Sequence, residues 1–241
     1  MVVLVTGSSR GIGAATIKEF AKNGYDVVIN YRVSYDEALK LQKEIEEYNV
    51  RSLVVKCDVS KEEEVQNMVN AIVKEFGTID VLINNAGVAK DTTLIDQTVD
   101  DFKKTLDVNL IGTFLVSKYI GQLMYDNKNG TIINISSTNG IDTTYPESID
   151  YDASKAGVIS LTRNFAKQFA PYVRVNSICP GWVNTKMNEN LSDEFRNREI
   201  DKILLGRFAE PSEVAYAIYS IAKCKYINDA IIRVDGGERP W

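Results

Sequence analysis

Tyr151 and Lys155 are four positions apart in a stretch with helical spacing, so they share one helix face about one turn apart. A phenol with a pKa of ~10 is a weak acid–base catalyst near neutral pH. A neighbouring ammonium group favours the phenolate and lowers that pKa. The pair is therefore a candidate for proton transfer, although most such pairs are only an exposed lysine beside a half-buried tyrosine.

The absence of histidine from the chain narrows the chemistry further. Acid–base catalysis near neutral pH must then use Tyr, Lys, Cys or a carboxylate with a shifted pKa. Serine–histidine and histidine–metal schemes are excluded. Cys57, Cys179 and Cys224 are odd in number and widely separated, so we expect reduced packing residues, no disulfide framework and no metal site.

A glycine-rich turn near the N-terminus is the second feature with chemical meaning. Val2 to Val5 read as a strand buried on both faces, and helical spacing begins beyond Gly7, Gly11 and Gly13. Glycines let the backbone approach an anion, and the first-turn N–H groups and the helix dipole attract it. The turn therefore predicts a phosphate site, or else a tight turn without a ligand. Its spacing differs from G-x-G-x-x-G.

Strands and helices alternate along the rest of the chain. This alternation predicts an α/β fold, a doubly wound parallel sheet of about seven strands in a single domain over 1–241. The predicted strands are 2–5, 26–31, 52–57, 80–84, 130–135, 173–178 and 231–234. Helical patterns cover 38–48, 65–76, about 99–124, about 150–169 and a stretch from 211 onward, with a polar irregular segment over 184–207.

Polar residues gather just past the predicted strands. Ligands of such sheets bind outside the carboxyl ends of the strands, near the switch in strand order. The sequence therefore predicts a ligand site at this edge of the sheet. The residues are Thr6 to Arg10, Asn30 to Arg32, Asp58, Asn84 to Gly87, Ser136, Ser137 and Pro180 to Thr185.

Composition bounds the class of partner. The net charge of −5 argues against nucleic acid or an anionic membrane as the main partner. No apolar run approaches the ~18 residues of a membrane span, and Met1 leads straight into a core strand. We expect a cytoplasmic protein.

The motifs together resemble the short-chain dehydrogenase/reductase family from Val2 to Gly237. The family's turn T-G-x-x-x-G-x-G stands at Thr6 to Gly13, and its N-N-A-G at Asn84 to Gly87. Its Y-x-x-x-K is Tyr151 to Lys155. Its serine, asparagine and P-G motifs match Ser137, Asn109 and Pro180-Gly181. The resemblance implies a Rossmann-type fold and a nicotinamide-dependent oxidoreductase.

The resemblance also implies roles for four residues. Tyr151 exchanges the proton with the reacting oxygen, Lys155 lowers its pKa and holds the nicotinamide ribose, and Ser137 polarises the oxygen. Asn109 positions a water that links Lys155 to solvent, or is only a residue at a helix bend. Strand alternation puts Ser136 and Ser137 on opposite faces, and the family pattern favours Ser137.

Charge after the second strand favours NADP(H). Relatives that bind NAD carry an acid there, whereas this chain has Asn30, Tyr31 and Arg32, and Arg10 lies in the glycine turn. Guanidinium groups pair with a 2′-phosphate, and a carboxylate repels it. The cofactor-binding residues implied by the resemblance are Gly7, Ser9, Arg10, Gly11, Ile12, Gly13, Tyr31, Arg32, Asp58, Val59, Asn85, Ala86, Gly87, Tyr151, Lys155, Pro180, Gly181, Val183 and Thr185.

The overall pattern is most similar to the 3-oxoacyl-[acyl-carrier-protein] reductases, which reduce 3-oxoacyl thioesters with NADPH. Relatives that dock the acidic carrier protein have arginines before strands five and six. In this chain, the corresponding stretches 126–129 and 170–172 contain one basic residue, Lys128. A reductase or dehydrogenase of another small carbonyl, sugar or alcohol is the alternative. The resemblance further implies a homotetramer and a lid after Pro180 that orders over the ligands.

A non-catalytic regulator that senses the cofactor is a hypothesis from another class. Such proteins typically lose the tyrosine or the lysine, and this chain keeps both Tyr151 and Lys155. The interval from Ser137 to Tyr151 is one residue longer than in many relatives. We therefore expect an atypical loop beside the substrate.

Overall fold

A computed structural model describes residues 1–238. Seven strands form one sheet in the order β3-β2-β1-β4-β5-β6-β7, and every neighbouring pair is parallel. Strand order reverses between β1 and β4, so the carboxyl ends of these strands flank the switch point. The expected doubly wound sheet is confirmed. The strands are β1 (Val2–Val5), β2 (Asp26–Tyr31), β3 (Ser52–Lys56), β4 (Val81–Asn84), β5 (Gly130–Ile135), β6 (Val173–Pro180) and β7 (Ile231–Val234).

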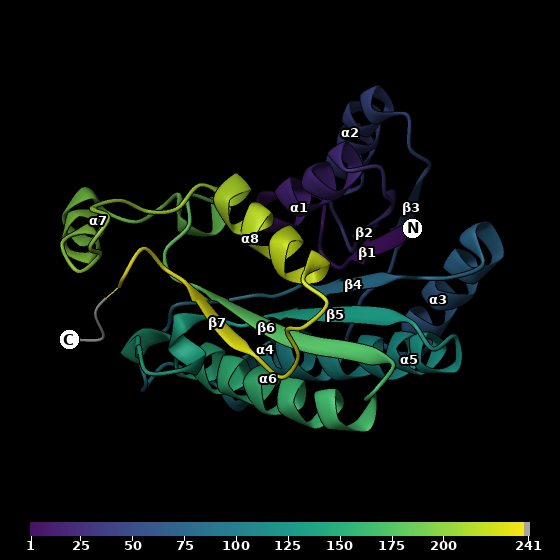
Figure 1. Cartoon of the computed structure of the whole chain (residues 1–241). Helices are drawn as coiled ribbons and strands as arrows, with labels where there is room; N and C mark the ends of the chain where they lie inside the picture. Colours follow the sequence, from purple (N-terminus) through teal and green to yellow (C-terminus); the bar gives the residue numbers. More distant parts are fainter. Residues whose placement is uncertain (239–241) are drawn as a thin grey trace.

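Helices cover both faces of the sheet (Figure 1). Alternation along β1 sends Val3 and Val5 into one core and Val2 and Leu4 into the other. The first core includes α1 (Gly11–Lys22), α2 (Tyr35–Ile45) and α8 (Pro211–Lys223). The second lies beneath α3 (Glu62–Phe76), α5 (Gly112–Asp126) and α6 (Ile149–Gln168). Both faces of the central strands are therefore apolar, as their uninterrupted hydrophobic runs predict.

The long helical region predicted over 99–124 has a break that periodicity does not reveal. α4 (Val99–Leu106) passes into a π-helical turn, Asp107–Ile111, before α5 begins. π turns inside helices are frequent at functional sites. This one contains Asn109, whose position in the site is described below.

The segment 184–207 contains a helix where the sequence predicts irregular chain. α7 (Asp193–Ile200) begins at Ser192, whose hydroxyl accepts a hydrogen bond from the Phe195 N–H at 3.2 Å. Asp193 and Glu194 in its first turn favour the N-terminus of a helix. The helix is polar and lacks a regular apolar stripe, so its capping residues were the only signal for it.

Short 3₁₀ turns occupy the loops that follow β5 and β6. They are Thr138–Gly140, Pro146–Ser148 and Lys186–Asn188, and a further turn, Glu46–Tyr48, follows α2. Within residues 1–238, no helix has the length and apolar character needed to cross a membrane.

Candidate active site

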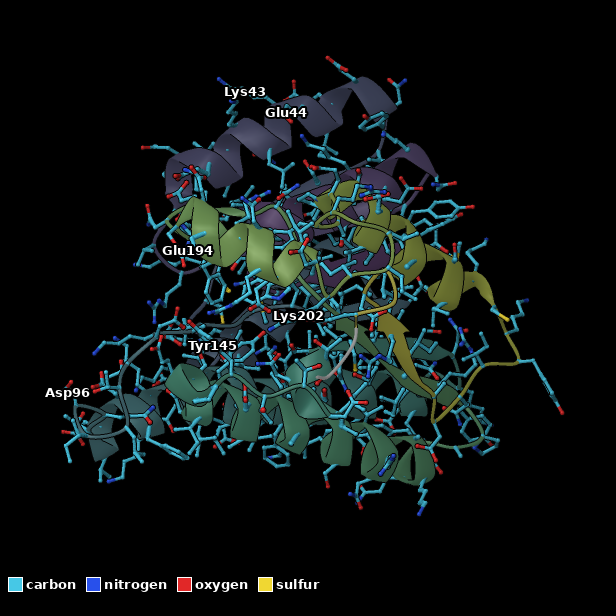
Figure 2. The ribbon with its side chains drawn as sticks, turned by 90° about the vertical axis from the view of Figure 1, so that its left-hand side faces the viewer. Lys43, Glu44, Asp96, Tyr145, Glu194 and Lys202 are labelled. Atoms are coloured by element: carbon cyan, nitrogen blue, oxygen red, sulfur yellow. The ribbon has the colours of Figure 1, made fainter. Side chains whose placement is uncertain are left out.

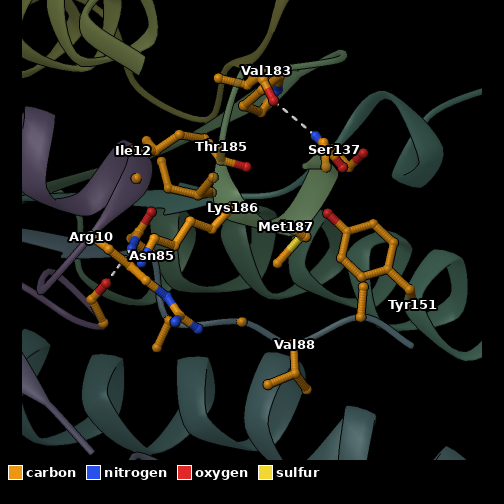
Figure 3. A pocket seen from close by; sticks show the side chains of 18 of the residues that line it. Arg10, Ile12, Asn85, Val88, Ser137, Tyr151, Val183, Thr185, Lys186 and Met187 are labelled. Atoms are coloured by element: carbon orange, nitrogen blue, oxygen red, sulfur yellow. Dashed lines mark hydrogen bonds between the residues drawn. The ribbon is translucent and has the colours of Figure 1, made fainter. Parts of the chain in front are cut away.

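A cavity of about 730 Å³ lies at the carboxyl ends of β1 to β6. Every residue expected to bind the cofactor or catalyse the reaction lines it, except Gly13 and Asn109. Figure 3 shows residues from the glycine turn and from Tyr151 on opposite sides of this space. Strand order, not sequence proximity, brings the two groups to one cavity.

The glycine turn presents free N–H groups to the cavity. Gly7 and Gly11 have φ of +61° and +57°, a region that favours glycine. Arg10 is the N-cap of α1, yet no side chain of residues 1–238 caps the helix, and its first turn contains no acid. An anion fits here because orphan N–H groups and the helix dipole both attract it. The turn therefore suits the pyrophosphate of a dinucleotide.

Gly13 does not line the cavity, and its expected contact with the cofactor stays a prediction. A Cβ atom on Gly13 would lie 2.6 Å from the Asn85 amide nitrogen and 2.8 Å from the Gly7 carbonyl. The missing side chain allows α1 to pack closely on the turn. Gly13 thus contributes to the site by letting α1 approach the glycine turn and Asn85.

Two buried side chains fix the turn to its neighbours. The Thr6 hydroxyl accepts hydrogen bonds from the N–H groups of Asn85 and Ala86, both at 3.0 Å. The Asn30 side chain accepts one from the Gly7 N–H at 2.9 Å and donates to the Cys57 carbonyl at 3.2 Å. The loops after β1, β2, β3 and β4 are therefore held in one arrangement. Sequence reasoning placed Asn30 near the cofactor but gave it no structural role.

Tyr151 lies in the first turn of α6. Its ring lies beside Ser137, which follows the end of β5 (Figure 3). Burial raises the pKa of the Tyr151 phenol to about 12, although a hydrogen bond with the Ser137 side chain acts in the opposite direction. Asp152 and Cys179 add to the increase. The hydroxyl group is therefore protonated at neutral pH.

Burial sets the direction of the Tyr151 pKa shift in this structure, and the expectation that Lys155 lowers that pKa stays a prediction. Its Nζ donates a hydrogen bond to the Ile135 carbonyl at 2.7 Å and lies 5.4 Å from the centre of the Tyr151 ring. The lysine is buried, and burial lowers its own pKa to about 8. For Lys155, desolvation outweighs the charge of Cys179, which acts to raise the lysine pKa.

Asn109 lies behind the cavity wall, in the π-helical turn. Its side-chain amide exchanges two hydrogen bonds with the backbone of Val88, at 2.8 and 2.9 Å. It also donates to the Ser154 hydroxyl at 3.0 Å, which in turn donates to the Tyr151 carbonyl at 2.7 Å. Asn109 therefore supports the helical turn that carries the tyrosine. Its role with a water molecule stays a prediction.

The two neighbouring serines have different partners. Ser136 is buried, and its hydroxyl donates to the Lys155 carbonyl at 2.8 Å, within α6. Ser137 accepts a hydrogen bond from the Asn139 N–H at 3.2 Å, and it lines the cavity together with Tyr151, whose pKa it acts to lower. Only Ser137 is therefore placed to contact a reacting oxygen together with the tyrosine.

Arg32 and Arg10 provide positive charge at the far end of the cavity. One guanidinium nitrogen of Arg32 lies 3.6 Å from Asp58, and the Arg32 side chain is 46% exposed. Burial acts to raise the pKa of Asp58, but hydrogen bonds from Ser60 and the charges of Arg32 and Lys61 lower it overall. The ion pair is loose, so the guanidinium can turn toward a ligand.

Aromatic residues form the opposite end of the cavity, which sequence analysis left unassigned. Tyr145 and Trp182 line it, with ring centres 6.5 Å apart. Phe195 of α7 packs edge-to-face on both, at 5.7 and 5.6 Å. Tyr145 lies between α7 and α6 (Figure 2). These residues come from two loops and a helix, so their spacing in sequence carried no signal.

Asp152 holds the loop that carries Tyr145. One carboxylate oxygen accepts a hydrogen bond from the Asn139 side chain at 2.6 Å, and the other accepts from the Tyr145 N–H at 3.0 Å. Asn139 also donates to Ser137. Asp152 therefore connects the helix of Tyr151 to the longer loop expected beside the substrate.

Comparisons with known proteins agree with this geometry. The family model for short chain dehydrogenases matches residues 1–195. The 3-oxoacyl-[acyl-carrier-protein] reductase FabG of Staphylococcus epidermidis is 37% identical over 97% of both chains. The 3-oxoacyl-[acyl-carrier-protein] reductase of Synechocystis sp. is 39% identical over 98% of this chain and 96% of the relative. FabG of Thermotoga maritima is 36% identical, with the same coverage.

Solved structures show the same fold. Levodione reductase superimposes with a TM-score of 0.92 at 30% identity, over 98% of this chain and 96% of that one. The structure named gox2181 gives a TM-score of 0.93 at 29% identity, over 98% and 94% of the two chains. The matched length, the shared fold and the residues gathered in the cavity lead to one conclusion: this chain belongs to the short-chain dehydrogenase/reductase family of oxidoreductases.

Proposed function

We propose that this protein is an NADPH-dependent carbonyl reductase that reduces 3-oxoacyl thioesters, of an acyl carrier protein or coenzyme A, to 3-hydroxyacyl thioesters. The placement of Ser137 and Tyr151 together, in the cavity whose far end is the glycine turn, carries the proposal. The names of the most similar relatives support the choice of substrate.

Tyr151 is the proton donor in this proposal. Its raised pKa keeps the phenol protonated at neutral pH, which is the state that reduction requires. Ser137 donates a hydrogen bond to the carbonyl oxygen and stabilises the charge that develops there. Lys155 holds a positive charge 5.4 Å from the centre of the ring, and it would also bind the nicotinamide ribose. A bound nicotinamide supplies the hydride, and the protein supplies orientation and the proton.

Positive charge supports the choice of NADPH over NADH. Arg10 and Arg32 line the cavity, and the position after β2 holds no carboxylate. The nearest acid, Asp58, is paired with Arg32 rather than free to bind a ribose hydroxyl. A 2′-phosphate would form charge-assisted hydrogen bonds with these guanidinium groups.

A second candidate is a reductase of another small carbonyl, sugar or alcohol. The places where relatives carry docking arginines hold one basic residue, Lys128, which lies 5.8 Å from the Tyr172 ring. An acidic chain with so little positive charge there attracts an acidic carrier weakly. Coenzyme A thioesters and small carbonyls need no such surface.

The predicted homotetramer is part of the proposal. Ile111, Phe114 and Ile149 are exposed apolar side chains at and around the two long helices where relatives associate. Burying these side chains in an interface would remove apolar surface from water. Sedimentation analysis of the purified protein tests this assembly.

A substrate panel tests the proposed function. We expect oxidation of NADPH with acetoacetyl-coenzyme A and with a 3-oxoacyl carrier protein, and slower oxidation of NADH. Turnover of only small ketones or sugars would favour the second candidate. Tight NADPH binding without turnover of any carbonyl would favour a cofactor-sensing regulator.

A further inference from the structure

Glu238 places a carboxyl group in the wall of the cavity, beyond the residues that carry the proposed chemistry. It follows β7 and lines the cavity with Ser137, Tyr151 and Trp182. The residue is 7% exposed, and glutamate is rarely buried unless it has partners. A buried carboxyl group at a ligand cavity therefore needs an explanation.

Within residues 1–238, one oxygen of this carboxyl group has a hydrogen-bond donor and the other has none. Oε2 accepts a hydrogen bond from the Thr138 hydroxyl at 3.0 Å. Among residues 1–238, no donor forms a hydrogen bond with Oε1. A Cβ atom on Gly181 would lie 2.9 Å from Oε2, so glycine at this position makes room for the carboxyl group.

The backbone around Glu238 is also held. Glu238 forms an antiparallel bridge with Ile203, and its carbonyl accepts a hydrogen bond from Arg233 at 3.4 Å. Burial raises the pKa of Glu238, the Thr138 hydrogen bond and Arg233 lower it, and Asp235 and Glu199 raise it further. The carboxyl group is thus oriented before any ligand arrives, which reduces the entropy lost on binding.

We propose that Glu238 binds the substrate, through a hydrogen bond from an N–H or O–H group that the substrate carries beyond its reacting carbonyl. Thr138 directly follows Ser137, and the carboxyl group that it holds lines the same cavity as Ser137 and Tyr151. An amide N–H of a thioester arm and a hydroxyl group of a small ketone offer the same chemistry. The proposal rests on the proposed carbonyl reduction and deepens it.

Two matched pairs of carbonyl compounds test the proposal and distinguish these sources. S-acetoacetyl-N-acetylcysteamine has an amide N–H, whereas S-ethyl acetothioacetate has none. 4-Hydroxy-2-butanone has a hydroxyl group, whereas 2-butanone has none. For Glu238→Leu we expect kcat/KM for the donor-bearing member of at least one pair to fall roughly 10- to 100-fold, mainly through KM. The other member of that pair should change less than about threefold.

Further variants separate binding from folding. Glu238→Gln keeps the size and an acceptor oxygen, so it should retain most of the discrimination. Thr138→Val frees the carboxyl group and should give a smaller loss with the same selectivity. Glu194→Gln removes an equal charge from the exposed face of α7 and should behave as wild type. Thermal denaturation and NADPH binding report whether each variant folds.

The outcomes are distinct. Equal losses on both members of each pair, or no loss, would overturn the role of Glu238 while leaving carbonyl reduction intact. A wild-type protein that reduces none of the four compounds, and neither acetoacetyl-coenzyme A nor a 3-oxoacyl carrier protein, would overturn the proposed function, and the substrate role of Glu238 with it. Loss confined to the thioester pair assigns the site to an amide, and loss confined to the ketone pair assigns it to a hydroxyl group.

Discussion

Replacement of Arg32 should change cofactor preference by an amount that the structure allows us to work out. A hydrogen bond to a charged group contributes about 1.5–3 kcal/mol. Arg32 must first leave Asp58, but the pair is 3.6 Å long and the arginine is 46% exposed, so the pair itself contributes at most about 1 kcal/mol. The net contribution to binding a 2′-phosphate is then about 1–2 kcal/mol.

This energy corresponds to roughly a 5- to 30-fold change, because 1.36 kcal/mol is a factor of ten. For Arg32→Gln we expect the ratio of kcat/KM with NADPH to kcat/KM with NADH to fall by that factor. Arg32→Asp adds repulsion between its carboxylate, Asp58 and the phosphate, so its ratio should fall roughly a further tenfold. Arg10 remains in both variants and should preserve part of the preference.

Initial rates of cofactor oxidation with one carbonyl substrate measure the ratio. The control is Arg51→Gln, because Arg51 pairs with Asp26 at 2.7 Å and does not line the cavity. It should leave the ratio unchanged. Added salt should reduce the wild-type preference, since exposed charges are screened. An unaltered ratio in Arg32→Asp, with both cofactors still bound, would refute the charge argument.

Four further outcomes follow from the site. Tyr151→Phe should reduce kcat roughly 10²- to 10⁴-fold while NADPH binding, followed by fluorescence, is retained; near-full turnover would contradict its role as proton donor. Asp152→Ala should raise KM and lower kcat together by roughly tenfold, because two hydrogen bonds to the substrate loop are lost. Asp152→Asn should recover part of this loss. A purely structural role would change only the melting temperature. Burial lowers the pKa of Lys155 to about 8, so the lysine loses its charge as pH rises through that value, and kcat/KM should fall there. Lys155→Arg should shift this fall to higher pH if the charge is what matters. Gly13→Ala places a Cβ atom 2.6 Å from Asn85, and if the strain is about 2 kcal/mol the melting temperature should fall by roughly 4–8 °C; an unchanged value would mean that α1 shifts without cost.

The local sequence pattern was sufficient to predict most of the strands and helices. The continuous apolar run of β1 predicts a strand buried on both faces, and the structure confirms it. The glycines at 7 and 11 adopt left-handed conformations that few other residues tolerate, so their type alone indicated the turn. Where hydrophobic periodicity was weak, as in the polar helix α7, the prediction of an irregular segment was wrong.

The sequence by itself determined which residues gather at the carboxyl end of the sheet, because parallel strands bring their ends to one edge whatever lies between them. Only the tertiary structure decided their surroundings. The pKa of Tyr151 depends on burial, the orientation of the Glu238 carboxyl group depends on its contact with Thr138, and the position of Gly13 depends on how α1 packs on the glycine turn. These properties arise from contacts between segments far apart in sequence, and spacing along the chain carries no record of them.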